Sequence, residues 1–287
     1  MLVFIGYFVV AAATLGGFMV AGGHPAVLMH VSEFIVIGGI GMGVLIVASP
    51  KDVMVNTVRA TANAIKGVLP GRDDYMDLLK LLYELFLTGK KSGLIALDEH
   101  VSEPQDSPIF QKYPGFLKNQ DRVDFLCNGL KPIIDGKIKP EQLQPLLEAE
   151  IETKEREAHG PITVLNLVGD SLPGIGIIAA VLGIINTMAA ISEGPEAVGE
   201  KVAAALTGTF LGILGAYGFV NPLTSRIKFN DESTVQYYNC MATALSAYAR
   251  GLAPIMAIEL ARRNVDAKML PGADELEQTL KAAISAR

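Results

Sequence analysis

Tryptophan is absent from this sequence of 287 residues, cysteine occurs only twice, and charged residues make up only 19% of it. The two cysteines, Cys127 and Cys240, lie too far apart for a zinc or redox motif, and a disulfide-rich scaffold is excluded. Half of the residues are hydrophobic, which excludes a disordered chain and is unusual for a cytosolic enzyme. The net charge of −6 argues against an extended nucleic-acid surface.

Four long segments contain no charged residue. A helix needs about 20 residues to cross a hydrocarbon core of about 30 Å, with about 17 as a practical minimum. All four segments reach that length, and they therefore predict four transmembrane helices. They are Met1–Gly23, Phe34–Pro50, Ser171–Ser192 and Val202–Ser225. The alternative for the first, a secretory signal peptide, lacks the basic residues with which such a peptide begins.

The basic residues predict the orientation in the membrane. The segment Lys51–Gly160 holds 15 of the 24 lysines and arginines, and the tail after Leu223 holds 8. The short connections between spans 1 and 2 and between spans 3 and 4 carry almost none. Because basic loops stay in the cytoplasm, both termini and the long central segment are expected inside.

The predicted fold is an all-α membrane protein with four transmembrane helices, a large helical cytoplasmic domain between spans 2 and 3, and a cytoplasmic tail. Leucines and a phenylalanine at helical spacing mark one amphipathic helix in that domain, at Leu78, Leu79, Leu82, Leu85 and Phe86. Another is expected to begin at Pro140, with Leu143, Leu146, Leu147 and Ile151 on one face. The chain thus divides into residues 1–50 (spans 1 and 2), 51–160 (cytoplasmic domain), 161–225 (spans 3 and 4) and 226–287 (helical extension and tail).

Pairs of small residues four apart occur in three of the spans. Small residues let membrane helices approach closely, and contacts between subunits are favoured here over contacts within one subunit. The pairs are Gly39 and Gly43, Ala179 and Gly183, and Gly208 and Gly212.

Prolines and a single hydroxyl mark the last two spans. Pro173 either kinks a helix or lies in the first turn of one capped by Asp170 or Ser171, and spacing alone does not separate the two. Pro222 lies near the end of span 4. Thr209 is an isolated hydroxyl in an apolar run, and its simplest role is a hydrogen bond back to its own helix.

The most informative absence in the spans is that of ionisable residues. Asp170 borders span 3, but no span has a carboxylate or histidine near its middle, whereas proton relays normally need one. Either the chain moves no ions or another chain supplies the acceptor. The four histidines are dispersed, so the sequence predicts no catalytic site, bound metal or cofactor.

Two long runs carry a family resemblance. Val168–Gly176, followed by Ala179–Gly183, and Gly208–Phe219, followed by Pro222, resemble the MotA family of flagellar-motor stator subunits. Shorter matches include Gly6-Tyr7, Tyr75–Leu79 and Glu148–Thr153. The resemblance extends over nearly the whole chain and agrees with the predicted topology.

The resemblance implies an inner-membrane homopentamer around two copies of MotB, which supplies an intramembrane Asp and anchors to peptidoglycan. Ion flux would turn the ring and drive the rotor protein FliG. It also implies that Pro173 and Pro222 couple conformation to ion passage and that Thr209 lies near the ion path. Sodium-driven relatives have Thr where this chain has Ala180, so proton coupling is expected, because Ala180 offers no oxygen ligand.

The family's rotor-contact pair is an Arg and a Glu in the cytoplasmic loop. Lys90 and Asp98 occupy those positions, with Lys91 and Glu99 adjacent. The signs of the charges are kept, but Lys lacks the bidentate fork of Arg. Without the resemblance, these charges would be assigned to an ordinary solvated loop.

Three other functions remain as alternatives. An energiser of the TolQ or ExbB type resembles a three-span protein, whereas this sequence predicts four spans. A solute carrier or channel that acts alone would need inverted repeats and polar groups at mid-membrane, and neither is visible. A membrane-scaffolding protein without ion coupling stays open as a further alternative.

Overall fold

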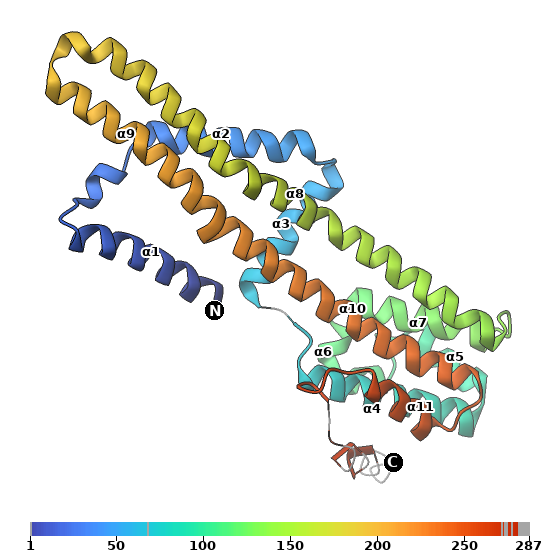
Figure 1. Cartoon of the computed structure of the whole chain (residues 1–287). Helices are drawn as coiled ribbons and strands as arrows, with labels where there is room; N and C mark the ends of the chain where they lie inside the picture. Colours follow the sequence, from blue (N-terminus) through green and yellow to red (C-terminus); the bar gives the residue numbers. More distant parts are fainter. Residues whose placement is uncertain (1, 68, 271, 273–274, 277, 281–287) are drawn as a thin grey trace. The chain divides into compact units, whose positions relative to one another are not determined.

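The computed structural model describes residues 2–67, 69–270, 272, 275–276 and 278–280. These residues form two compact units, and no strand occurs among them (Figure 1). Unit 1 comprises Met1–Val68 and Arg156–Asn230, and unit 2 comprises Leu69–Glu155 and Asp231–Arg287. Two long helices, α8 (Pro140–Ala190) and α10 (Asn221–Ala249), contribute residues to both units.

Unit 1 contains the apolar helices. Four helical segments are long and apolar enough to cross a membrane, which confirms the prediction of four spans. They are Leu2–Val20, Pro25–Ala48, Pro140–Met188 and Pro195–Ala249. The elements of the unit are α1 (Leu2–Val20), η1 (Pro25–Leu28), α2 (Val31–Ala48), α3 (Lys51–Lys66), the second part of α8, η3 (Ile191–Glu193), α9 (Pro195–Leu214), η4 (Gly215–Val220) and the start of α10.

Helix α8 is continuous over 51 residues. It begins at Pro140, as predicted, because a first-turn proline lacks only an N–H that would have no partner there. Pro173 lies in the interior of this helix, so the alternative in which Asp170 or Ser171 caps a new helix is wrong. Pro173 therefore removes the main-chain hydrogen bond that the Gly169 carbonyl would otherwise accept.

The fourth span changes its helical pitch just before Pro222. Residues Gly215–Val220, labelled η4, form a π-helix between α9 and α10. Pro222 has no N–H to donate to the Gly218 carbonyl, and a wider turn accommodates that missing bond. Helix α10 then continues to Ala249, which confirms that the fourth span extends well beyond the apolar run.

Unit 2 is a helical bundle around one apolar core. It consists of α4 (Arg72–Ser92), α5 (Leu94–Ser102), η2 (Phe110–Lys112), α6 (Pro114–Leu117), α7 (Gln120–Ile134), the first part of α8, the second part of α10, and α11 (Pro254–Arg263). The predicted leucines of α4 and Phe86 are fully buried in this core. Phe86 stacks on Tyr248 of α10, with ring centroids 4.2 Å apart. On α8, Leu143, Leu147 and Ile151 are buried as predicted, but Leu146 is 49% exposed, because it lies off their face of the helix.

Candidate functional site

Helices α8 and α9 touch along their main chains in unit 1 (Figure 1). A Cβ on Gly212 would lie 2.6 Å from the Leu172 carbonyl oxygen and 2.7 Å from the Gly176 Cα. A Cβ on Gly176 would lie 2.8 Å from the Gly208 carbonyl oxygen. These positions leave no room for a side chain, and glycine is what allows the two helices to approach so closely.

Four of the six predicted packing residues therefore contact another helix of the same chain. Ala179 is buried, and a Cβ on Gly183 would lie 2.8 Å from the Ala205 Cβ. With Gly208 and Gly212 they form one seam between α8 and α9, whereas the sequence had favoured contacts between subunits. The remaining pair, Gly39 and Gly43, has no atom of another described element within 4 Å of its Cβ positions.

A buried carboxylate joins this seam from α2. Glu33 is only 4% exposed, and its Oε2 would lie 2.6 Å from a Cβ on Gly208. Its Oε1 accepts a hydrogen bond from the Ser32 hydroxyl at 3.4 Å, but Oε2 is buried without a partner. An unpaired carboxylate in the apolar part of a membrane protein is costly, and such groups mark ion or proton paths.

Glu33 lies outside the uncharged segments that mark the spans, because the second of these begins one residue later. The structure places Glu33 beside the middle of span 3. The Ala180 main-chain nitrogen would lie 3.3 Å from the same Gly208 Cβ position. Ala180 is ten residues, or about 15 Å along the helix, beyond Asp170. Glu33 is in the first turn of α2, and packing against Gly208 brings it level with Ala180 of span 3.

Thr209 follows Gly208 in this seam. It is half-buried, and within the described ranges its hydroxyl has no hydrogen-bond partner. The expected bond back to its own helix is instead made by Thr207, whose hydroxyl donates to the Ala203 carbonyl at 2.9 Å. Thr209 therefore keeps a free hydroxyl one residue from the contact between Glu33 and Gly208.

The helices that carry the two prolines meet one turn before Pro173. Gly169, whose carbonyl is left without a donor by Pro173, lies so close to the Asn221 side chain that a Cβ there would overlap its Oδ1. That oxygen is buried without a hydrogen-bond partner, and Asn221 directly precedes Pro222. Asp170, next to this contact, is exposed. The two turns that lack a main-chain hydrogen bond, at Pro173 and Pro222, thus lie beside the contact between Gly169 and Asn221. A small rotation of one helix at this contact would shift the other helix.

The four predicted rotor-facing charges lie on the surface of unit 2. Lys90 and Lys91 are exposed in the last turn of α4, and Glu99 is exposed on α5. Asp98 is half-buried and accepts a hydrogen bond from the Ser102 hydroxyl at 3.2 Å. Across the described residues none of the four charges forms an ion pair, so all are free to meet a partner.

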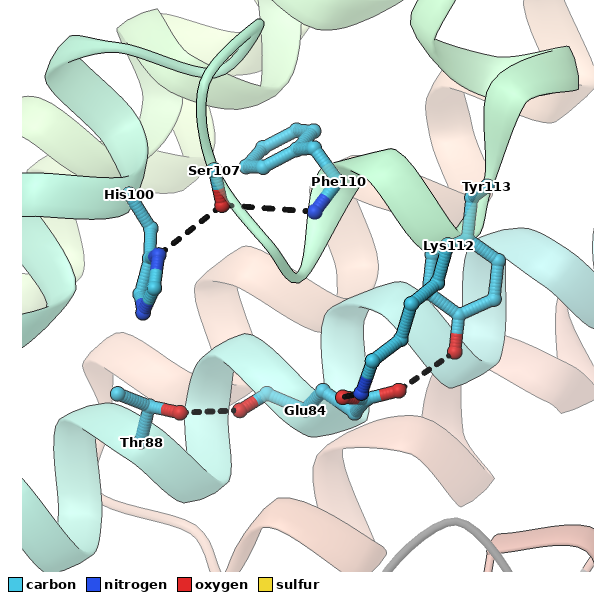
Figure 2. Close-up of polar contacts among 7 residues, drawn as sticks. All are labelled: Glu84, Thr88, His100, Ser107, Phe110, Lys112 and Tyr113. Carbon is cyan, nitrogen blue, oxygen red and sulfur yellow. Dashed lines mark hydrogen bonds and ion pairs between the residues drawn. The ribbon is translucent and has the colours of Figure 1, made fainter. Parts of the chain in front are cut away.

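A buried polar cluster fixes the segment that follows α5 (Figure 2). Glu84 of α4 has a side chain only 5% exposed, and it accepts hydrogen bonds from the Lys112 ammonium at 2.5 Å and from the Tyr113 hydroxyl at 2.8 Å. Burial, together with the hydrogen bond to Glu84, raises the pKa of Tyr113. At the other end of the segment, the His100 Nδ1 lies 3.0 Å from the Ser107 hydroxyl. These contacts tie the segment to α4 and α5, the helices that carry the surface charges.

Metal binding has no support in the described part of the chain, where no three His, Cys, Asp or Glu side chains cluster.

Comparison with known families identifies the class. Residues 4–93 match the family model described as "Motility protein A N-terminal", and residues 118–239 match "MotA/TolQ/ExbB proton channel family". The chain belongs to the MotA/TolQ/ExbB proton channel family.

Three individual proteins are similar to this chain over nearly its whole length. The chain is 35% identical to Motility protein A of Salmonella typhimurium, over 98% of this chain and 96% of the relative. It is 34% identical to Motility protein A of Escherichia coli, with the same coverage, and 33% identical to Chemotaxis protein LafT of Vibrio parahaemolyticus, over 96% and 97%.

Solved structures share the fold. The chain matches the C. jejuni MotAB structure with a TM-score of 0.76 at 20% identity, over 92% of this chain and 95% of that one. It matches the flagellar MotAB stator complex of Bacillus subtilis with a TM-score of 0.72 at 21% identity, over 96% and 98%.

Proposed function

We propose that this chain is a stator subunit of the bacterial flagellar motor. With a MotB-type partner it forms a proton channel of the inner membrane, and proton flux through that channel generates torque on the rotor protein FliG. The observation that carries the proposal is the 35% identity to a motility protein A over nearly the full length of both chains.

The assembly in this proposal is a ring of five copies around two copies of the partner. Both termini and unit 2 lie in the cytoplasm, because basic residues are concentrated there. Gly39 and Gly43 are the candidates for contacts between subunits, since their small surfaces meet no other element in the described part of the chain. The division into 1–50, 51–160, 161–225 and 226–287 follows from this topology.

The ion path in this proposal follows the seam between α8 and α9. Glu33 receives protons on the side of the α1–α2 connection and passes them toward the partner's intramembrane Asp. Thr209 provides a free hydroxyl beside that path, and Ala180 supplies no oxygen, which favours protons over sodium. Pro173 and Pro222 allow their helices to bend when the partner's intramembrane Asp gains or loses a proton. Asp170 lies at the cytoplasmic exit of the path.

Torque is transmitted in this proposal through the charges of unit 2. Lys90 and Lys91 offer positive charge, and Asp98 and Glu99 offer negative charge, to complementary charges on FliG. Such pairs guide encounter and register more than they add stability.

An energiser of the TolQ or ExbB type is the second candidate, because the match to residues 118–239 names that wider family. The separate match of residues 4–93 to a motility protein model favours the motor. Deleting the gene separates the two: loss of swimming with intact flagella supports the motor, and normal swimming contradicts it.

Reconstitution tests the channel. Liposomes with the chain alone should hold a proton gradient, because one carboxylate at mid-membrane is not a relay across about 30 Å of hydrocarbon. Liposomes with the chain and its partner should leak protons, at a rate that does not depend on sodium at fixed pH. A specific proton leak without the partner, or a leak that requires sodium, would contradict the proposed mechanism.

A further inference from the structure

A groove in unit 1 runs between α1 and the π-helical end of the fourth span. It has a volume of about 300 Å³, and its walls are almost entirely apolar. The α1 side is lined by Leu2, Val3, Gly6, Tyr7 and Val10, and the other side by Tyr217, Gly218, Pro222, Leu223 and Arg226.

Specific contacts hold the groove open. The Tyr7 hydroxyl donates a hydrogen bond to the Phe219 carbonyl at 3.0 Å, and the two rings pack with centroids 4.9 Å apart. Gly218 lets α1 come close, because a Cβ there would lie 3.0 Å from a Val10 methyl. Gly6, in contrast, has no atom within 4 Å of its Cβ position, so the absence of a side chain there leaves the groove empty.

A single charge marks one end of the groove. Arg226 directly follows the last uncharged run, which puts its guanidinium at the membrane boundary. Its Nε is buried without a hydrogen-bond partner, and no carboxylate lines the groove. Among the described residues the Arg226 guanidinium forms no ion pair, so it is available to an anion from outside the chain.

We propose that this groove binds an anionic phospholipid. One acyl chain lies along the stretch from Leu2 to Val10, about 12 Å of helix, and the phosphate accepts hydrogen bonds from Arg226. Phosphate is the anion that a membrane offers at the depth where a span ends, and basic residues at that depth attract anionic lipids. No residue of α1 is buried in the chain, so the groove is open to the acyl chains of the bilayer.

A second copy of the chain is the other possible occupant. It would have to bring an apolar surface along the groove and a carboxylate to Arg226 at the same time, and Asp170, which borders the third uncharged run, is the carboxylate that could reach that depth. A lipid supplies both in one molecule. The bound lipid would join α1 to the turn before Pro222, and the anionic lipid content of the membrane would thus act on a segment that moves in the proposed function.

Native mass spectrometry of the intact complex with its partner tests whether the positive charge of Arg226 contributes to lipid binding. With added phosphatidylglycerol, Arg226→Gln should weaken lipid binding about fivefold, which is the effect of one basic residue at an anionic surface. Lys51→Gln is the matched control, because Lys51 is exposed, borders the second uncharged run and does not line the groove. Phosphatidylcholine, whose phosphate charge is offset by its choline cation, should bind more weakly and lose less affinity on Arg226→Gln. Equal effects of the two substitutions on phosphatidylglycerol would overturn the proposal.

Photo-crosslinking identifies the occupant directly. A photoreactive residue in place of Val3 should form an adduct with the mass of a phospholipid, and Gly6→Leu, which fills the groove, should remove that adduct. A crosslink between two copies of the chain in place of the lipid adduct would overturn the proposal and assign the groove to a subunit interface. Both readouts are independent of motor function, so the lipid site can fail while the stator function stands.

Discussion

At the scale of single residues, the carboxylate of Glu33 carries the ion-path hypothesis. Its Oε2 is buried without a partner beside Gly208, where a titratable group would serve proton transfer. Glu33→Gln keeps the shape and removes the titration, and we expect proton flux in the reconstituted complex to fall by roughly tenfold or more.

Ser32→Ala is the control for Glu33→Gln, because it removes only the hydroxyl that donates to Oε1. It should leave the flux nearly unchanged. Native mass spectrometry of both variants should show an intact oligomer. Wild-type flux in Glu33→Gln would remove this residue from the path.

The hydrogen bond from Tyr113 to Glu84 is expected to stabilise unit 2. Tyr113→Phe removes the hydroxyl that donates to the buried Glu84 carboxylate, and such a loss costs about 1–3 kcal/mol. Tyr83→Phe is the matched control, because Tyr83 is buried on the same helix as Glu84 but its hydroxyl makes no hydrogen bond in the described part of the chain. Thermal unfolding followed by circular dichroism should separate the two variants, and equal melting temperatures would show that the bond contributes nothing.

At the scale of helices, the seam between α8 and α9 is held by close approach of main chain to main chain. Gly212→Ala should push the helices apart and destabilise the protein by about 1–3 kcal/mol, because the nearest atoms belong to the backbone of α8 and cannot rotate away. The measurement is the melting temperature of the purified complex.

Gly39→Ala provides the comparison for Gly212→Ala. A Cβ at Gly39 would meet no atom of another element among the described residues, so the stability of one subunit should not change. A change in oligomeric mass for Gly39→Ala alone would support a role between subunits. If Gly212→Ala unfolded at the wild-type temperature, the seam would be looser than the backbone distances indicate.

At the scale of the whole molecule, the surface charges of unit 2 should matter for torque and little for folding. Lys90→Glu and Asp98→Lys should each reduce swimming speed, while membrane insertion is unchanged and the free energy of unfolding stays within about 0.5 kcal/mol of wild type. Lys137→Glu is the control, since Lys137 is 77% exposed and its ion pair with Asp135 is a surface pair. Unchanged swimming in both Lys90→Glu and Asp98→Lys would show that these residues are ordinary solvated charges without a role in torque.

The sequence by itself determined the number of spans, the helical fold and the family resemblance. Each of these depends on local composition: an uncharged run of sufficient length has few alternatives to a membrane helix, and the leucine spacing of α4 selects its buried face. The resemblance depends on runs of consecutive residues, which the chain carries whether folded or not, and the relatives bear it out.

Only the tertiary structure decided which residues meet. Glu33 and Ala180 are almost 150 positions apart, and packing of α2 and α8 against Gly208 brings them together. It also decided that Pro173 interrupts a continuous helix, that Thr209 keeps a free hydroxyl, and that Glu84 pairs with Lys112. These facts follow from helix packing, which depends on side-chain volumes at several distant positions together, and a pattern read along one segment cannot contain them.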